Sequence, residues 1–338
     1  MGGEGAQLSA ASKVALVGVS SLCISTTSIL LRQAEHNDEI AFSPIAASFF
    51  GELMKASVAF VMMACTPGSF AQARKISGRT AGLFLLPACL YVLTNNLRFF
   101  IVRAVNPGLI GVMWNLKIVV VALLYQCPPF NRPLSGRQWA GALLLVAGSA
   151  AAKVSQGDSL ASDGGSNSGG TLGVAMLLVG LSLAASAGVS CEYAYKGTSH
   201  ELCFPAQCSF LYAFGACLNL AAFVGWEVYG DAHAPAADSS AAAAAASKHV
   251  GFPGSLLVGM DAWAWAAVTM LSAVGFVISL IFKYIDTVAQ VFGDVAAMFI
   301  TAALASVQFG LVVSCDLLEP SSRRLLLPQR SPPLLRAR

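Results

Sequence analysis

The sequence is poor in charged residues. Asp, Glu, Lys and Arg make up 11% of the 338 residues, whereas 56% are hydrophobic and the mean hydropathy is +0.69. Soluble domains carry about 25% charged residues, because their surfaces face water. The shortage of charge therefore excludes a soluble protein, and it indicates an all-α, polytopic membrane protein.

Signatures of enzymes and of metal sites are also missing. The sequence contains no phosphate-binding P-loop, no G-x-S-x-G motif and no H-E-x-x-H motif. The histidines fall in expected loops without metal-ligand spacing, at His36, His200, His233 and His249. We therefore expect no chemical catalysis, no metal, no cofactor and no nucleic-acid partner.

Nine cysteines are present, but none is spaced as C-x-x-C, and most lie inside apolar segments. This distribution favours cysteines that pack as small hydrophobic side chains over a disulfide framework.

Long apolar segments divide the chain. A bilayer core of about 30 Å requires about 20 apolar residues per helix. Segments that meet this requirement are 13–31, 41–64, 81–103, 107–127, 137–154, 171–195, 204–229, 261–283 and 287–313. The sequence therefore predicts about nine transmembrane helices.

Basic residues indicate the orientation, because cytosolic loops carry an excess of Lys and Arg. They follow the second, fourth and sixth segments, at Arg74, Lys75, Arg79, Arg132, Arg137 and Lys196. The linker 155–170 has no positive charge, and the low-complexity loop 230–260 has a single Lys. The even-numbered helices are therefore expected to end in the cytosol, where the N-terminus also lies.

Lys117 is the one charged residue in segment 107–127. A charge at bilayer depth costs a few kcal/mol, so it is retained where a cavity, a partner or an anionic ligand compensates it. Lys117 is therefore predicted to bind an anionic ligand. The alternative is an internal ion pair.

Segment 81–103 adds polar candidates. Asn95 and Asn96 point about 100° apart on a helix, so one is expected to meet a ligand and the other a neighbouring helix. Tyr91 lies one turn before Asn95, on the same side. The alternative for all three is hydrogen bonding between helices. Arg98 is a further candidate cation for an anion.

Glu52 and Lys55 lie three residues apart in segment 41–64. On one helix face they are expected to neutralise each other inside the membrane.

Three blocks of residues in the first half have a distinctive order and spacing: Asn95-Asn96-Leu97 with Phe99, then Leu116-Lys117-Ile118, then Arg132, Leu134-Ser135 and Gln138-Trp139. They resemble the Golgi nucleotide-sugar transporters of the drug/metabolite transporter superfamily, the carriers of CMP-sialic acid, UDP-galactose and UDP-N-acetylglucosamine. Asn106-Pro107 and Asn115-Leu116-Lys117 look most similar to the plant-type CMP-sialic-acid-transporter-like branch. In the second half, similar blocks are Ser190–Lys196, Gln207, Tyr212, Gly215 and Lys283–Thr287.

The resemblance implies two inverted five-helix repeats that exchange a cytosolic UDP- or CMP-sugar for a luminal nucleoside monophosphate. The first repeat would be 1–154, followed by a luminal linker at 155–170 and a second repeat at 171–314 that includes loop 230–260. The location would be the Golgi membrane, with the endoplasmic reticulum membrane as the alternative. Such repeats place the substrate near the bilayer midplane, between the two halves.

The resemblance also suggests which residues form the substrate site: Lys117, Asn95, Asn96, Tyr91, Asn115, Glu192, Tyr212, Lys283, Asp286 and Gln290. Lys117 would contact phosphate. Glu192 would either pair with a basic residue or gate the cavity. Lys283 and Asp286 would either form an ion pair or contact the ligand. The residues leave open whether the base is uridine or cytidine.

The chain departs from the family pattern at several points, of which three bear on the site and on the fold. Gln290 stands where family members carry a second lysine, and Asp294 adds a negative charge. The basic tail 315–338 is interrupted by proline and arginine, so either the tenth helix is missing or the ninth does not span the membrane. Without a tenth helix, Asp294, Thr301 and Gln308 would form an uncovered polar stripe, which predicts either lower stability than a ten-helix relative or a homodimer. These departures motivate an alternative function, a non-transporting membrane scaffold.

Overall fold

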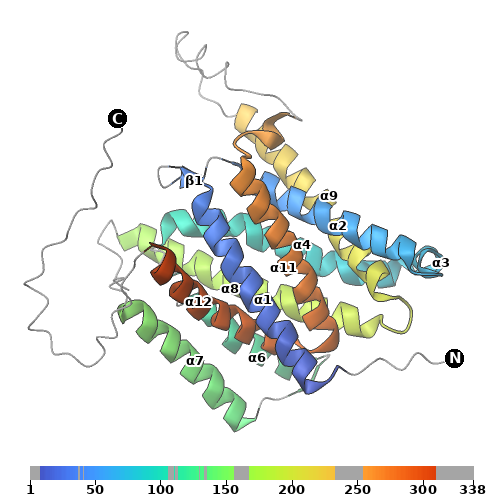
Figure 1. The fold of residues 1–338 in the computed structure, drawn as a ribbon, viewed down its shortest axis with the longest axis horizontal. Coiled ribbons are helices and arrows are strands. Elements are labelled where there is room, and N and C mark those ends of the chain that lie inside the picture. The colour runs from blue at the N-terminus through green and yellow to red at the C-terminus, as the bar shows by residue number, and fades with distance from the viewer. Residues whose placement is uncertain are drawn as a thin grey trace, which may run out of the picture.

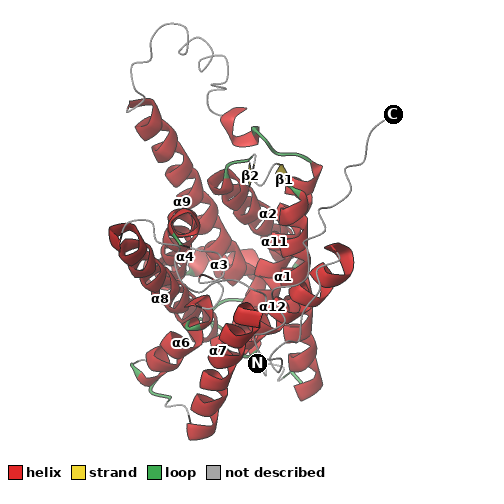
Figure 2. Cartoon of the chain, turned by 90° about the vertical axis from the view of Figure 1, so that its left-hand side faces the viewer, coloured by secondary structure: helices red, strands yellow, loops and turns green. Residues whose placement is uncertain are grey.

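The computed structural model describes residues 8–36, 39–40, 42–105, 110, 113–128, 130–132, 135–155, 167–232 and 254–309. These residues form a bundle of helices (Figures 1 and 2). Its helices are α1 (Ala10–Gln33), α2 (Pro44–Cys65), α3 (Ser69–Lys75), α4 (Gly78–Ala104), α6 (Lys117–Gln126), α7 (Gly136–Ser155), α8 (Asn167–Gly197), α9 (Phe204–Ala232), α11 (Ala262–Tyr284) and α12 (Thr287–Phe309). A short 3₁₀ helix, η1 (Gly254–Leu257), precedes α11, and a two-residue ladder joins β1 (Glu35–His36) to β2 (Glu39–Ile40).

Every predicted transmembrane segment overlaps one of these helices, but α6 covers only the second half of segment 107–127. Within the described ranges, α1, α2, α4, α8, α9 and α11 are long and apolar enough to cross a membrane, and Met113–Gln126 and Thr287–Thr301 are shorter apolar helices. The prediction of an all-α, polytopic membrane protein is therefore confirmed. The short helix α3 was not predicted, and α8 begins at Asn167, inside the predicted linker. Asn106-Pro107, most of loop 230–260 and the tail 315–338 lie outside the described residues.

Side-chain caps explain why several helices begin where they do. The hydroxyls of Ser9, Ser43 and Ser77 and the carboxylate of Asp261 each accept a hydrogen bond from a backbone N–H in the first turn of α1, α2, α4 and α11, respectively. These bonds satisfy donors that have no partner within the helix, and each contributes about 1 kcal/mol.

The main contacts between helices are the same when the helices of the first half of the chain are swapped with those of the second half. The helices α1, α2, α4 and α6 correspond to α8, α9, α11 and α12, in that order. α1 packs against α11 and α12, and its counterpart α8 packs against α4 and α6. Likewise, α4 packs against α9, and its counterpart α11 packs against α2. The central pairs, α2 with α9 and α6 with α12, map onto themselves when the two halves are swapped. Two repeats related by a pseudo-two-fold axis produce this pattern. The repeat boundaries themselves remain predictions.

Two hydroxyls join α1 to α12 directly. Ser21 Oγ donates to the carbonyl of Gly293 at 2.8 Å, and Ser25 Oγ donates to the carbonyl of Ala297 at 2.9 Å. Each hydroxyl also donates to the carbonyl four residues earlier in α1. Small residues and hydroxyls of this kind allow helices in a membrane to approach closely, so the first helix is fixed to the second half of the chain.

The predicted orientation can be tested by labelling. Gln72 Oε1 in α3 accepts from the backbone N–H of Cys203, which follows α8, so α3 lies at the end of α8. The 31 residues of α8 extend about 45 Å, which places Asn167 on the opposite side. In a chain whose native cysteines are replaced by alanine, Arg74→Cys should react with an impermeant maleimide from the cytosol. Asn167→Cys should react only after the vesicles are opened. Reaction of both from one side contradicts this topology.

Candidate functional site

Lys117 opens α6 and lies at the interface between the two halves of the chain. Its side chain is buried, and its Nζ lies 2.8 Å from Asp294 Oδ2 and 3.4 Å from Gln290 Oε1 on α12. Gln290 Nε2 also donates to Asp294 Oδ2, at 2.6 Å. These three residues, named here the Lys117 cluster, bring together one positive charge, one negative charge and one amide.

The Lys117 cluster is electrically neutral as it stands. The internal ion pair that the sequence left open as an alternative is formed, and the predicted contact with phosphate remains a prediction. A buried charge is strongly unfavourable once its partner is removed. An anionic ligand that engages Lys117 therefore competes with the carboxylate of Asp294 for the ammonium group.

The expected uncovered stripe on α12 is wrong at Asp294. The carboxylate faces Lys117 on α6, and 28% of its side chain is exposed. The side chain of Gln308 lies outside the described part of the structure, and the side chain of Thr301 is partly exposed. The rest of the stripe therefore remains a prediction. The periodicity of α12 alone could not reveal the contact, because the lysine belongs to another helix.

The polar residues of α4 lie on different sides of the helix. Asn96 Nδ2 donates to the carbonyl of Val92 at 2.8 Å, so this amide is used within its own helix. Tyr91 and Asn95 are both partly exposed, and their side chains have no hydrogen-bond partner among the described residues. Asn96 thus uses one of its two amide hydrogens within α4, whereas Asn95 and Tyr91 use none of their polar atoms among the described residues. Asn115 Nδ2 lies 3.9 Å from Met298 Sδ on α12.

Glu192 is the centre of a second buried cluster. Its side chain is fully buried, and Oε1 accepts a hydrogen bond from Lys196 Nζ at 2.7 Å. Its Oε2 accepts from the hydroxyl of Tyr125 and from the backbone N–H and hydroxyl of Thr287, the last two at 2.7 Å. Lys196 Nζ also donates to the carbonyl of Ile285 at 2.6 Å. The cluster joins the ends of α6 and α8 to the junction of α11 and α12.

Pairing with a basic residue was one of the two roles considered for Glu192, and the pair with Lys196 is formed, whereas the gating role remains a prediction. Tyr125 was missed, since nothing in the sequence of α6 indicates that its hydroxyl reaches α8. Thr287 was recognised only as part of a block similar to the family. The ends of α6, α8, α11 and α12 are therefore tied together on the side that we predict to be cytosolic.

Lys283 and Asp286 do not form the ion pair that was considered for them. Lys283 Nζ donates to Gln207 Oε1 on α9 at 2.7 Å, and it lies 5.4 Å from the ring centroid of Phe204. Asp286 Oδ1 accepts from the backbone N–H of Ala289 at 2.7 Å and thereby caps α12. The cap holds the carboxylate near its own backbone, so the lysine turns towards α9 instead.

Glu52 and Lys55 form the predicted ion pair on α2, at 2.5 Å, and both side chains are largely buried. Lys55 Nζ lies 4.8 Å from the ring centroid of Tyr212 on α9. A Cβ at Gly275 would lie 2.6 Å from Lys55 Cδ, and one at Gly215 would lie 2.8 Å from Glu52 Oε2. Glycine at these two positions therefore leaves the room that the ion pair occupies.

Tyr212 was predicted to contact substrate, but its hydroxyl is already engaged. It donates to the carbonyl of Gly275 at 3.1 Å and lies 2.6 Å from Ser279 Oγ, which also accepts from the hydroxyl of Tyr195. These bonds connect α8, α9 and α11. In this conformation Tyr212 supports the packing around the Glu52–Lys55 pair.

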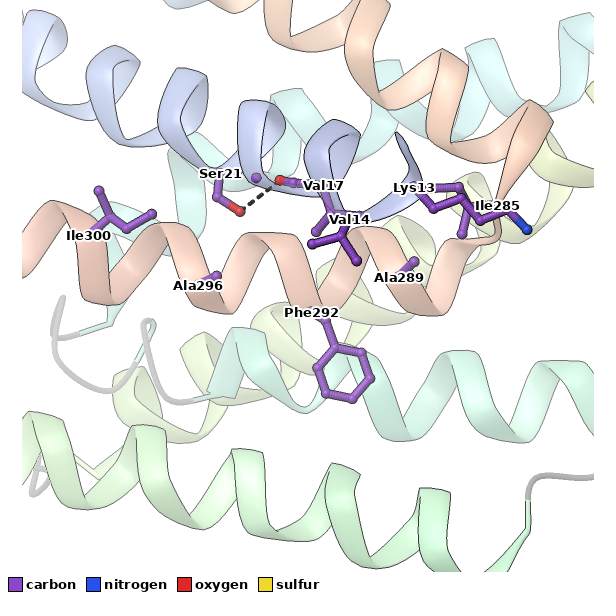
Figure 3. A pocket seen from close by; sticks show the side chains of 10 residues that line it. Lys13, Val14, Val17, Ser21, Ile285, Ala289, Phe292, Ala296 and Ile300 are labelled. Carbon is purple, nitrogen blue, oxygen red and sulfur yellow. Dashed lines mark hydrogen bonds between the residues drawn. The ribbon is translucent and has the colours of Figure 1, made fainter. Parts of the chain in front are cut away.

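An open apolar groove runs along the outside of α1 and α12 (Figure 3). Its lining includes Lys13, Val17, Phe292 and Ala296. Phe292 lies two positions before Asp294, which is about 200° around the helix. The groove therefore faces away from the Lys117 cluster and is not the candidate substrate site.

The Glu192 cluster provides a stability prediction. Glu192→Gln removes the charge that Lys196 pairs with, and it replaces one accepting oxygen by an NH₂ group in a place where every partner of Glu192 is a donor. We expect a loss of about 2 kcal/mol and a melting temperature in detergent lower by about 5 °C. Tyr193→Phe, at an exposed neighbouring position, is the matched control and should melt with the parent. Equal melting of both variants would show that the cluster contributes nothing to stability.

Most of the chain is similar to known proteins of one family. The family model described as nucleotide-sugar transporter matches residues 10–318. CMP-sialic acid transporter 1 of Oryza sativa subsp. japonica is 28% identical over 300 residues, which cover 87% of this chain and 85% of the relative. CMP-sialic acid transporter 3 of Arabidopsis thaliana is 26% identical over 323 residues, which cover 90% of this chain and 72% of the relative.

Proposed function

Because the chain belongs to the nucleotide-sugar transporter family, we propose that it carries a CMP- or UDP-linked sugar from the cytosol into the Golgi lumen and carries a nucleoside monophosphate back. The observation that supports this proposal most is the buried Lys117 between the two halves of the chain. A nucleotide sugar brings phosphate charge, and a buried ammonium group is the partner that this charge requires. The names of the relatives make a CMP-linked sugar the first substrate to test.

The proposed mechanism assigns one task to each cluster. Phosphate displaces Asp294 from Lys117, while Asn95 and Tyr91 offer an amide and a hydroxyl on α4, where Tyr91 lies within electrostatic range of Asp294. The Glu192 cluster closes the cytosolic side in the conformation described here. Opening this side requires the bonds of Glu192 to Thr287 and Tyr125 to break, so that the two halves can rock about the fixed substrate.

Uptake into proteoliposomes tests the proposal. The purified chain should accumulate radiolabelled CMP-sialic acid or a UDP-sugar above the level of protein-free liposomes. The unlabelled nucleotide sugar should compete, and the free sugar should not. If none of the CMP- and UDP-sugars is taken up by a chain that is folded and correctly inserted, the transport function is wrong.

One observation favours the second candidate function, a membrane scaffold that does not transport. Lys117 is neutralised by Asp294, and Gln290 contributes no second positive charge to the cluster. A scaffold would show no uptake and no stabilisation by nucleotides. The two candidates therefore differ in both measurements.

A further inference from the structure

From the ion pair in the Lys117 cluster, we infer that the empty carrier can reorient across the membrane, so that inward transport does not require a nucleoside monophosphate in the lumen. The inference rests on the proposed transport function and deepens it. It concerns the return step of the cycle, in which the site moves back to the cytosolic side without a substrate.

During the return step, the charge of Lys117 has to pass through a closed state of the carrier. In alternating access, the site passes through a conformation in which neither side of the membrane is open to water. A lysine without a partner is costly in that conformation, because neither water nor an anion solvates it. Such a carrier reorients only when a bound anion neutralises the lysine, and exchange then becomes obligatory.

In this chain the charge of Lys117 is compensated without a bound anion. Asp294 supplies an internal counter-ion 2.8 Å from Lys117 Nζ. Gln290, one turn earlier on α12, holds the carboxylate in place through its bond of 2.6 Å. Lys117 is 8% exposed, so the pair is formed in a largely buried position. The empty site is therefore already neutral.

The other charged groups near the cluster lie outside the contact between Lys117 and Asp294. Tyr91 and Arg98 on α4 are within electrostatic range of Asp294. Tyr91 is a phenol, which is neutral at physiological pH. Arg98 is exposed, and its guanidinium lies 5.5 Å from the ring centroid of Trp114. Lys55 is paired with Glu52. Asp294 is thus the carboxylate in contact with Lys117 among the described residues.

The ion pair of Lys117 with Asp294 should also weaken the binding of substrate. Phosphate has to compete with Asp294 for the same ammonium group, and the displaced carboxylate keeps only its bond to Gln290. The parent should therefore bind substrate less tightly than a variant whose cluster carries a net positive charge.

Two substitutions give the cluster a net positive charge by different routes. Asp294→Asn removes the carboxylate and leaves Lys117 uncompensated. Gln290→Lys adds a second ammonium and keeps Asp294 as the partner of Lys117, so it reaches the same net charge without removing the ion pair. Asp294→Glu preserves the charge and serves as the matched control.

The measurement is the initial rate of uptake into vesicles that are either empty or loaded with CMP or UMP. For the parent and Asp294→Glu, we expect the ratio of loaded to empty rates to be close to one. For Asp294→Asn and Gln290→Lys, uptake into empty vesicles should fall and the ratio should rise about tenfold, because the empty site then carries an unpaired charge.

The outcomes separate the inference from the function on which it rests. A parent that takes up nucleotide sugar only into loaded vesicles overturns the inference and leaves the transport function intact. Unchanged ratios in both charged variants overturn it as well. If Asp294→Asn does not fold, Gln290→Lys decides the question alone. Absence of uptake by the parent under both conditions overturns the transport function and the inference with it.

Discussion

Replacing Lys117 by glutamine is expected to reduce nucleotide-sugar uptake about 100-fold, to near the level of protein-free liposomes. Glutamine keeps approximately the length of the side chain but removes the charge that would meet the phosphate. Charge-assisted hydrogen bonds are the strong ones in proteins, and losing one inside a buried site costs about 3 kcal/mol. The readout is the initial rate of uptake, normalised to the amount of inserted protein.

The neighbouring carboxylate requires a second variant. In Lys117→Gln the carboxylate of Asp294 loses its ion-pair partner, and the fold can suffer for that reason alone. The double variant Lys117→Gln/Asp294→Asn removes both charges, so it should melt close to the parent and still fail to transport. A double variant that transports at the parental rate would falsify the phosphate role of Lys117.

The largest expected effect on stability comes from the Glu52–Lys55 pair. Lys55→Met leaves the carboxylate of Glu52 largely buried without its partner. Removing one member of a buried ion pair costs about 3–5 kcal/mol. The melting temperature of the variant in detergent should therefore fall by about 5–10 °C.

The double variant Glu52→Gln/Lys55→Met separates structure from ligand binding. Two neutral side chains of similar size should restore most of the melting temperature, because no uncompensated charge remains. If the pair is purely structural, uptake is restored as well. A double variant that is stable but inactive would instead assign Lys55 a contact with substrate. A single variant that melts with the parent contradicts the structural role.

Features encoded locally could be predicted from the sequence. The transmembrane helices were found because a run of about 20 apolar residues is a requirement set by the bilayer alone. Glu52 and Lys55 were paired correctly because a spacing of three places both on one helix face. Lys117 was singled out because an isolated charge in an apolar helix requires compensation.

Contacts between helices could not be predicted in the same way. The bond of Glu192 to Tyr125 joins residues 67 positions apart, and the pair of Lys117 with Asp294 joins residues 177 positions apart. The composition of one helix does not reveal which face of another helix it meets. Asp294 was therefore assigned to an uncovered stripe, although it is the counter-ion of Lys117.

The central claim is that the phosphate of a nucleotide binds at Lys117 by displacing Asp294. Melting of the purified chain with CMP, UMP and the corresponding nucleosides tests it most directly. At about 100 times the dissociation constant, a bound monophosphate stabilises the folded state by about 2.7 kcal/mol. We predict that CMP or UMP raises the melting temperature of the parent, that cytidine and uridine do not, and that Lys117→Gln/Asp294→Asn responds to none of them. Equal stabilisation of parent and double variant by a monophosphate, or no stabilisation of the parent, would contradict the claim.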